Sequence, residues 1–375
     1  MKPPIIDLSR SLSRSRRGSP TGIDRVEAEL YAAMRRQGPV HALVRSGRNA
    51  WLTTASPDFD ALSRNSLDLR GALSPWRDTH RRRVEAGMRR WSDAHSFDLD
   101  SVSPEGRWLI LLGHSFPVPG VMSTWRAGGG KVAVLVHDLI PLDHPEWSRP
   151  EPTARFNVAM DEVAACASLV LHLTDTGRRR WHTRFEVPDA QRHEILPMGA
   201  SPLPVLPRNP RHPPTFVAVG TIEPRKGHDM LLDVWQTMGE HAELHIIGRR
   251  GWQNEATFNR LDRKPKGVIE CGALDDSALV TAYAQATALL FPSRAEGFGL
   301  PVLEARRAGL PVIASDLPEL IELHGTSITT VPKEDPAEWT LAICNALEDF
   351  RTNDREETPS WTSWDDSARV LLDLL

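Results

Sequence analysis

Short apolar runs alternate with helix-length segments along this chain, and the alternation occurs twice. In the first half "RWLILLGH" and "KVAVLVHD" are runs of this kind, and "TARFNVAMDEVAACASL" is a helix-length segment after them. In the second half "TFVAVG" and "ALLFPS" repeat the pattern, and "LPVLEARRAG" follows as a helix. Continuous apolar runs are typical of parallel strands buried on both faces and joined by right-handed helical crossovers. The sequence predicts an α/β fold: two doubly wound parallel-sheet (Rossmann-like) domains facing a central cleft.

A proline-rich segment separates the two alternations. Residues 201–214, "SPLPVLPRNPRHPP", contain six prolines, which interrupt any regular element. At 375 residues the chain also exceeds what one hydrophobic core usually supports. We expect an N-terminal domain over residues 1–200, a linker over 201–214 and a C-terminal domain over 215–355. Residues 356–375 contain a last helix that can pack back on either domain, the N-terminal one included.

The composition is that of a globular protein, with 40% hydrophobic and 25% charged residues and a net charge of −4. No apolar run reaches the length needed to cross a bilayer, and "MKPPIIDLSR" lacks the features of a secretory signal. These observations predict a cytoplasmic protein. Cys166, Cys271 and Cys344 lie far apart, which excludes a disulfide framework or a paired-cysteine metal site.

Two adjacent cations follow the first strand of the second half. Arg225 and Lys226 lie in "TIEPRKG", directly before a glycine and a predicted helix. Open parallel sheets bind ligands at the carboxyl ends of their strands. A guanidinium fork and an ammonium group at such an end suit a diphosphate. The alternative interpretation is a solvated basic loop.

The stretch "RAEGFGLPVLEA" sets two carboxylates around a glycine turn. Glu296 precedes the turn, Glu304 follows it, and Pro301 favours a helix that begins at Leu300 or Pro301 itself. The backbone amides of the turn would then form an anion site at the helix N-terminus, where glycines allow close approach. The residues of this candidate donor site are Gly297, Phe298, Gly299 and Leu300.

Carboxylates beside a phosphate repel it unless hydroxyl groups donate hydrogen bonds to them. A nucleotide sugar supplies both kinds of group, a diphosphate for the cations and hydroxyls for the acids. The alternative is a capped helix with two incidental acids. On the first interpretation one acid binds the sugar hydroxyls and the other the ribose diol.

The segments "GTIEPRKG" and "CGALDDSALVTAYAQATALLFPSRAEGFGLPVLEARRAGLPVIASDLPEL" resemble the nucleotide-binding domain of the family-four retaining glycosyltransferases of the GT-B fold. The resemblance implies that Glu296 contacts the transferred sugar, Glu304 the ribose and Lys226 the donor diphosphate. Many members have a second phosphate-binding arginine where this chain has Thr221. Arg225 is the candidate for supplying that charge.

The first half resembles the polysaccharide-building, mannosyltransferase-like members through "VAVLVHDLIPLDHPEW". This resemblance implies that His137 contacts the transferred sugar, although a lone histidine is often structural. Asp138 is an alternative cap of the following turn. Gly22, in "GSPTGIDRV", is placed to let its loop approach the diphosphate, and Arg25 is a weaker candidate one turn later.

The resemblance implies a retaining, metal-independent hexosyltransferase without a cofactor. Its donor would be a GDP-mannose-like or UDP sugar, and its acceptor a saccharide or lipid-linked saccharide in cell-surface polysaccharide synthesis. We find no histidine cluster suited to a catalytic metal. Two other functions remain open: a non-catalytic nucleotide-sugar-binding scaffold of an assembly complex, and a sugar-nucleotide epimerase of the same fold.

Two arginine-rich segments bear on partners. The run "SRSLSRSRRGSP" has no interleaved aromatic residues, so we do not expect nucleic-acid binding. The arginines at 81–83, 89 and 90, followed by Trp91, could rest on anionic lipid head groups or form a solvated face. Contact of this kind would place the protein at the inner face of the cytoplasmic membrane.

Overall fold

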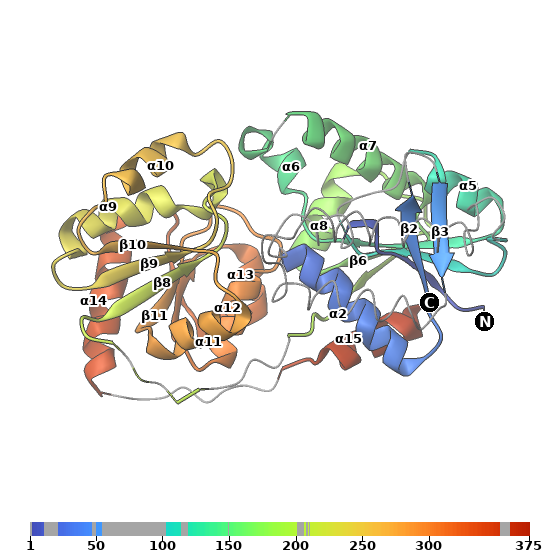
Figure 1. Cartoon of the computed structure of the whole chain (residues 1–375). Coiled ribbons are helices and arrows are strands. Elements are labelled where there is room, and N and C mark those ends of the chain that lie inside the picture. The colour runs from blue at the N-terminus through green and yellow to red at the C-terminus, as the bar shows by residue number, and fades with distance from the viewer. Residues whose placement is uncertain are drawn as a thin grey trace, which may run out of the picture.

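The computed structural model contains two parallel sheets, each covered by helices on both faces, in two lobes side by side (Figure 1). The residues that the structure describes are 2–10, 22–46, 50–54, 103–113, 119–148, 150–200, 206–207, 209, 211–352 and 361–375. The predicted α/β class with two Rossmann-like domains is confirmed. Half of the expected linker and all of the arginine-rich segment around residues 81–91 lie outside this description.

The sheet of the N-terminal domain has seven strands in the order β3-β2-β1-β4-β5-β6-β7. Its strands are β1 (Ile5–Asp7), β2 (His41–Ser46), β3 (Ala50–Thr54), β4 (Trp108–Leu111), β5 (Lys131–Val136), β6 (Leu169–His172) and β7 (Arg192–Ile195). Its principal helices are α2 (Gly22–Gln37), α5 (Val121–Ala127), α6 (Ile140–Asp143), α7 (Pro150–Cys166) and α8 (Asp175–Arg184). The pairing of β2 with β3 is antiparallel, which the expectation of a purely parallel sheet did not include.

The sheet of the C-terminal domain has six parallel strands in the order β10-β9-β8-β11-β12-β13. These are β8 (Thr215–Val219), β9 (Glu243–Ile247), β10 (Val268–Gly272), β11 (Ala288–Phe291), β12 (Val312–Ser315) and β13 (Thr329–Val331). The helices are α9 (His228–Met238), α10 (Glu255–Asp262), α11 (Asp276–Gln285), α12 (Leu300–Arg307), α13 (Pro318–His324) and α14 (Pro336–Thr352). The strand order reverses between β8 and β11, which makes their carboxyl ends the switch point of the sheet.

The apolar runs form central strands that are buried on both faces, as the sequence predicted. All four residues of β4, β6, β11 and β12 are buried, because helices cover each of these strands on both faces. Each sheet therefore has one hydrophobic core on either side. The fully buried Trp125 and Trp181 fill the N-terminal domain, and Trp339 fills the C-terminal one.

The last helix, α15 (Trp364–Leu374), lies against α2 in the N-terminal domain (Figure 1). Trp364, Ala368 and Leu371 enter the core cluster that also holds Leu30. A capping box at Ser363 starts the helix, because the Ser363 hydroxyl accepts from the Asp366 amide and the Asp366 carboxylate accepts in return. The chain thus crosses to the C-terminal domain and returns.

Candidate functional site

The two sequence motifs of the C-terminal domain meet because β8 and β11 are neighbouring parallel strands. Lys226 ends a short 3-10 helix, Pro224–Lys226, after β8, and Glu296 lies in the loop after β11. The Lys226 ammonium donates to Glu296 Oε1, and Arg225 Nη1 lies 3.2 Å from the same oxygen. Both cations and the first acid of the turn therefore form one cluster, in which Glu296 is buried and the two cations are partly buried.

Two further contacts hold Arg225 in this cluster. Arg225 Nε lies 2.6 Å from Glu223 Oε1, and Arg225 Nη1 donates to the Ala295 carbonyl at 3.1 Å. Burial alone would raise the pKa of Glu296, but Lys226 and Arg225 lower this pKa to about 2. Burial lowers the pKa of Lys226, and the Glu296 carboxylate opposes that shift. Glu296 is consequently ionised at neutral pH and can accept hydrogen bonds without acting as an acid.

Gly227 lets the lysine loop approach the strand beside it. Its φ of 67° is left-handed, and a Cβ there would lie 2.1 Å from the Pro292 carbonyl oxygen. A glycine is required at this position for both reasons.

Thr221 lies in the loop after β8. The resemblance leads us to expect an arginine at this position in many relatives. A Cβ on Gly251 would lie 2.8 Å from the Thr221 methyl group.

The glycine turn touches the N-terminal domain. A Cβ on Gly297 would lie 2.1 Å from the His137 carbonyl oxygen, so the two backbones approach closely. Gly299 has a φ of 79° and precedes α12, which begins at Leu300 as predicted. Phe298 and Leu300 pack against the core cluster of the N-terminal domain. A Cβ on Gly22 would lie 2.9 Å from Leu300 Cδ1, which places Gly22 beside the turn.

The second acid of the motif is paired across the domain boundary. Arg25 Nη1 lies 2.5 Å from Glu304 Oε1, and Arg25 Nη2 lies 2.7 Å from Asp276 Oδ1. Burial raises the pKa of Glu304, and the Arg25 charge opposes this. Arg25 was the weaker sequence candidate, yet the structure joins it to the carboxylate expected to bind ribose.

His137 and Asp138 follow β5, opposite the glycine turn. His137 Nε2 lies 2.6 Å from the Leu112 carbonyl oxygen, which can only accept, so Nε2 carries the proton. Asp138 Oδ1 accepts from the Ile140 amide at 3.1 Å, which is the capping contact weighed as its alternative role. Burial raises the pKa of Asp138, while Arg225 and His137 oppose that shift.

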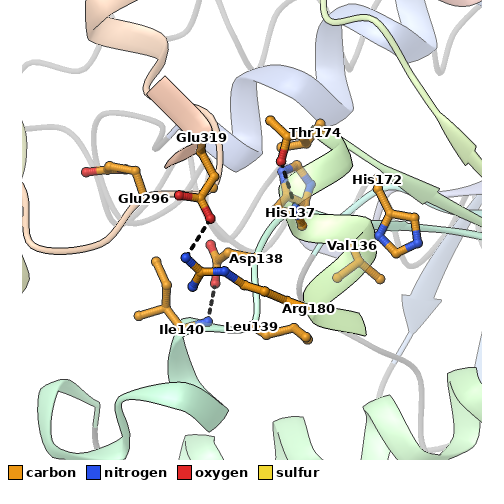
Figure 2. Close-up of a pocket in the computed structure, with 13 residues that line it drawn as sticks. Val136, His137, Asp138, Leu139, Ile140, His172, Thr174, Arg180, Glu296 and Glu319 are labelled. Carbon is orange, nitrogen blue, oxygen red and sulfur yellow. Dashed lines mark hydrogen bonds and ion pairs between the residues drawn. The ribbon is translucent and has the colours of Figure 1, made fainter. Parts of the chain in front are cut away.

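A pocket between the domains is lined by residues of both the His137 segment and the glycine turn (Figure 2). The N-terminal domain contributes His137 and Arg180 among its lining, and the C-terminal domain contributes Glu296, Gly297 and Glu319. Sequence reasoning missed Arg180 and Glu319. A search of every strand end would have found Glu319, because it follows β12, the neighbour of β11.

Two further properties concern metals and membranes. The described residues contain no group of three or more histidine, cysteine, aspartate or glutamate side chains placed to hold a metal ion. Within the same parts of the chain, no helix combines the length and the apolar character needed to cross a bilayer.

Comparison with known proteins shows what this chain is similar to in sequence and in fold. Residues 213–349 match the family described as "Glycosyl transferases group 1". Among solved structures, a sucrose-phosphate synthase from Thermosynechococcus elongatus aligns over 100% of this chain and 95% of its own, with a TM-score of 0.62 and 17% identity. Anabaena Alr3699/HepE, solved in complex with UDP, aligns over the same shares with a TM-score of 0.59 and 14% identity. These neighbours have the GT-B fold.

Relatives with assigned activities that are similar in sequence to this chain include mannosyltransferases. The serotype-specific mannosyltransferase WbdA of Escherichia coli is 30% identical over 290 residues, which are 70% of this chain and 36% of that protein. The O-antigen chain mannosyltransferase B of Escherichia coli is 28% identical over 235 residues, 58% of this chain and 62% of that protein. The chain thus spans about a third of the length of WbdA. The C-terminal domain, over residues 213–349, matches the group 1 glycosyltransferases, and the predicted resemblance is confirmed at the level of family and fold.

Proposed function

We propose that this protein is a glycosyltransferase of cell-surface polysaccharide synthesis. It transfers a sugar with retention, without a metal or cofactor, from a nucleoside-diphosphate sugar to a saccharide or lipid-linked saccharide. The observation that carries the proposal is the cluster of Lys226, Arg225 and Glu296, whose carboxylate lines the same pocket as His137 of the other domain. The match to the glycosyltransferase family supports it.

The donor diphosphate binds at Lys226 and Arg225. In the structure these two cations are balanced by Glu296 and Glu223, so a diphosphate needs additional positive potential. The amides at the start of α12 supply it, since a helix N-terminus attracts anions. Glu304 accepts from the ribose hydroxyls, which then replace Arg25 as its partner.

The reaction needs no protein nucleophile. The leaving diphosphate takes the proton of the acceptor hydroxyl, which attacks the anomeric carbon from the face that the diphosphate leaves. Lys226, Arg225 and the amides of the turn stabilise the charge that develops on the leaving group. Closure of the domains excludes water from the bond that breaks.

The donor is GDP-mannose or a related GDP sugar, with UDP sugars as the next choice. The similarity to proteins described as mannosyltransferases supports the sugar.

Calorimetric titration with GDP, UDP, ADP and dTDP tests the donor site. One nucleotide should bind, and Glu304→Gln should weaken it at least about tenfold, because a charged acceptor for the ribose is lost. Asp276→Asn is the matched control: it also removes a partner of Arg25, yet its carboxylate is half exposed on α11 and should change affinity less than about twofold. Failure of every nucleotide to bind would remove the proposal.

Incubation of the bound nucleotide sugar with and without saccharide acceptors separates the alternatives. A transferase releases nucleoside diphosphate at a rate that rises with acceptor. An epimerase changes the nucleotide sugar without any acceptor, and a scaffold binds it without turnover.

Lipid contact through the arginines near residues 81–91 is part of the proposal, and co-sedimentation with anionic vesicles tests it.

A further inference from the structure

Glu319 is a buried carboxylate in the pocket that the proposed mechanism does not use. It lies in the first turn of α13, directly after β12, and only 3% of its surface is exposed. It lines the same pocket as His137 and Glu296, the two residues assigned to the transferred sugar (Figure 2). A carboxylate buried at such a place needs partners.

Its partner comes from the other domain. Arg180 Nη2 of α8 lies 2.9 Å from Glu319 Oε1. One turn further along α13, the Glu322 carboxylate accepts from the Asp175 amide at 2.5 Å and from the Thr176 amide at 2.9 Å, at the first turn of α8. The two helices, which face each other between the lobes, are therefore joined twice (Figure 1). This arrangement orients the Glu319 carboxylate relative to both domains.

The charges of the pocket favour one kind of ligand. Asp138, Glu296 and Glu319 line it, against the single guanidinium of Arg180, which Glu319 already pairs. Lys226 and Arg225 contact Glu296 but are not part of this lining, and the donor diphosphate would occupy them. Carboxylates accept hydrogen bonds from hydroxyls and repel another anion. Such a pocket suits a ring that carries hydroxyls and no charge.

We propose that Glu319, oriented by Arg180, accepts hydrogen bonds from hydroxyls of the transferred sugar. By the same charge it selects a neutral sugar against the corresponding uronic acid. This inference rests on the proposed function, because it assigns the pocket to the sugar of a nucleotide-sugar donor. Glu319 is then a specificity-determining residue and Arg180 a positioning residue.

Calorimetry on the full chain tests this with matched probes, GDP-mannose against GDP-mannuronate and UDP-glucose against UDP-glucuronate. The pair to use is the one whose nucleoside diphosphate, GDP or UDP, binds the protein. The affinity of each nucleotide sugar is then compared with the affinity of that diphosphate alone. The wild type should bind the neutral donor at least about 100-fold more tightly than the uronate. Glu319→Gln should weaken the neutral donor about tenfold, strengthen the uronate, and leave the nucleoside diphosphate unchanged, since a charged acceptor becomes a neutral amide.

Glu322→Gln is the control, because it weakens the junction of α8 and α13 without lining the pocket. This substitution should change the affinities for the neutral donor and for the uronate by the same factor, so that the ratio of the two affinities stays as in the wild type. Arg180→Gln should lower the ratio of neutral-donor to uronate affinity although Glu319 is still present, because the carboxylate loses the partner that orients it.

Three results overturn the inference: equal binding of both donors by the wild type, an unchanged ratio in Glu319→Gln, or a neutral sugar that adds nothing to the affinity of its diphosphate. Absence of any nucleoside-diphosphate binding is a different result, which removes the proposed function itself.

Discussion

At the residue scale, the site consists of charges that compensate one another before any ligand arrives. Lys226 and Arg225 share Glu296, and Arg225 also pairs with Glu223. Removing one partner from a buried pair leaves the other charge unpaired, which costs more free energy than the pair contributes. The same residues therefore affect stability and ligand binding, and the two effects need separate measurement.

Lys226→Gln should lower the affinity for the bound nucleoside diphosphate more than tenfold and destabilise the fold by about 3 kcal/mol, because Glu296 loses its closest cation. Calorimetry gives the first quantity and urea unfolding the second. Lys266→Gln removes an exposed pair with Glu240 and should change neither by much. Equal effects of both substitutions would contradict the assigned role of Lys226.

A buried histidine gives a pH prediction. His228 begins α9 and is 3% exposed, and burial, followed by the Lys226 charge, lowers its pKa to about 4. An unfolded histidine has a pKa of about 6.5. The unfolded state therefore binds more protons between these values. Stability from neutral His228 is present above about pH 6.5 and is lost as the pH falls toward about 4.

Urea unfolding at pH 7, 6 and 5 measures this contribution. The wild type should lose up to about 1.4 kcal/mol per pH unit more than His228→Gln over that window. His241→Gln, at an exposed position, should follow the wild type. Parallel curves for wild type and His228→Gln would show that the histidine is not buried as a neutral group.

At the element scale, neighbouring strands bring the functional residues together. The β8 and β11 strands pair at Ala288 and Phe216, so the loops after them meet although about 70 residues separate Lys226 from Glu296. Helix α15 joins more distant parts of the chain, since it is the last element and completes the core over α2, which begins at Gly22.

Leu371→Ala should destabilise the N-terminal domain by about 2–5 kcal/mol, because Leu371 is fully buried and the helix cannot collapse into the space left. Asp373→Ala, on the exposed side of α15, should stay within about 0.5 kcal/mol of the wild type. Thermal unfolding followed by calorimetry measures both. A small effect of Leu371→Ala would mean that α15 detaches readily from α2.

At the scale of the whole molecule, the contacts that hold the domains together around the pocket include three that differ in kind. The Gly297 backbone approaches the His137 carbonyl, Arg25 pairs with Glu304, and Glu322 accepts from the amides of α8. Two of these involve residues assigned to the donor. Donor binding and domain closure are consequently coupled in the proposed mechanism.

Gly297→Ala should keep the domains from closing, because its Cβ would lie 2.1 Å from the His137 carbonyl oxygen. Turnover should fall at least about 100-fold, the effect expected from misplacing reacting groups by about 1 Å. Binding of the nucleoside diphosphate alone should fall much less. Gly38→Ala, where nothing lies within 4 Å of the added Cβ, is the control. Normal turnover in Gly297→Ala would show that the close approach is not needed.

The sequence by itself determined the two α/β domains and the start of α12, and it singled out Lys226, Glu296 and Glu304 as candidates, because apolar periodicity and strand-end motifs are local patterns. It did not determine Arg180 and Glu319 as one pair, or Arg25 as the partner of Glu304. These residues lie far apart in the chain, on surfaces of two domains that meet only in the folded molecule. Only the tertiary structure decided which charges face each other, since no local pattern encodes the orientation of one domain on another.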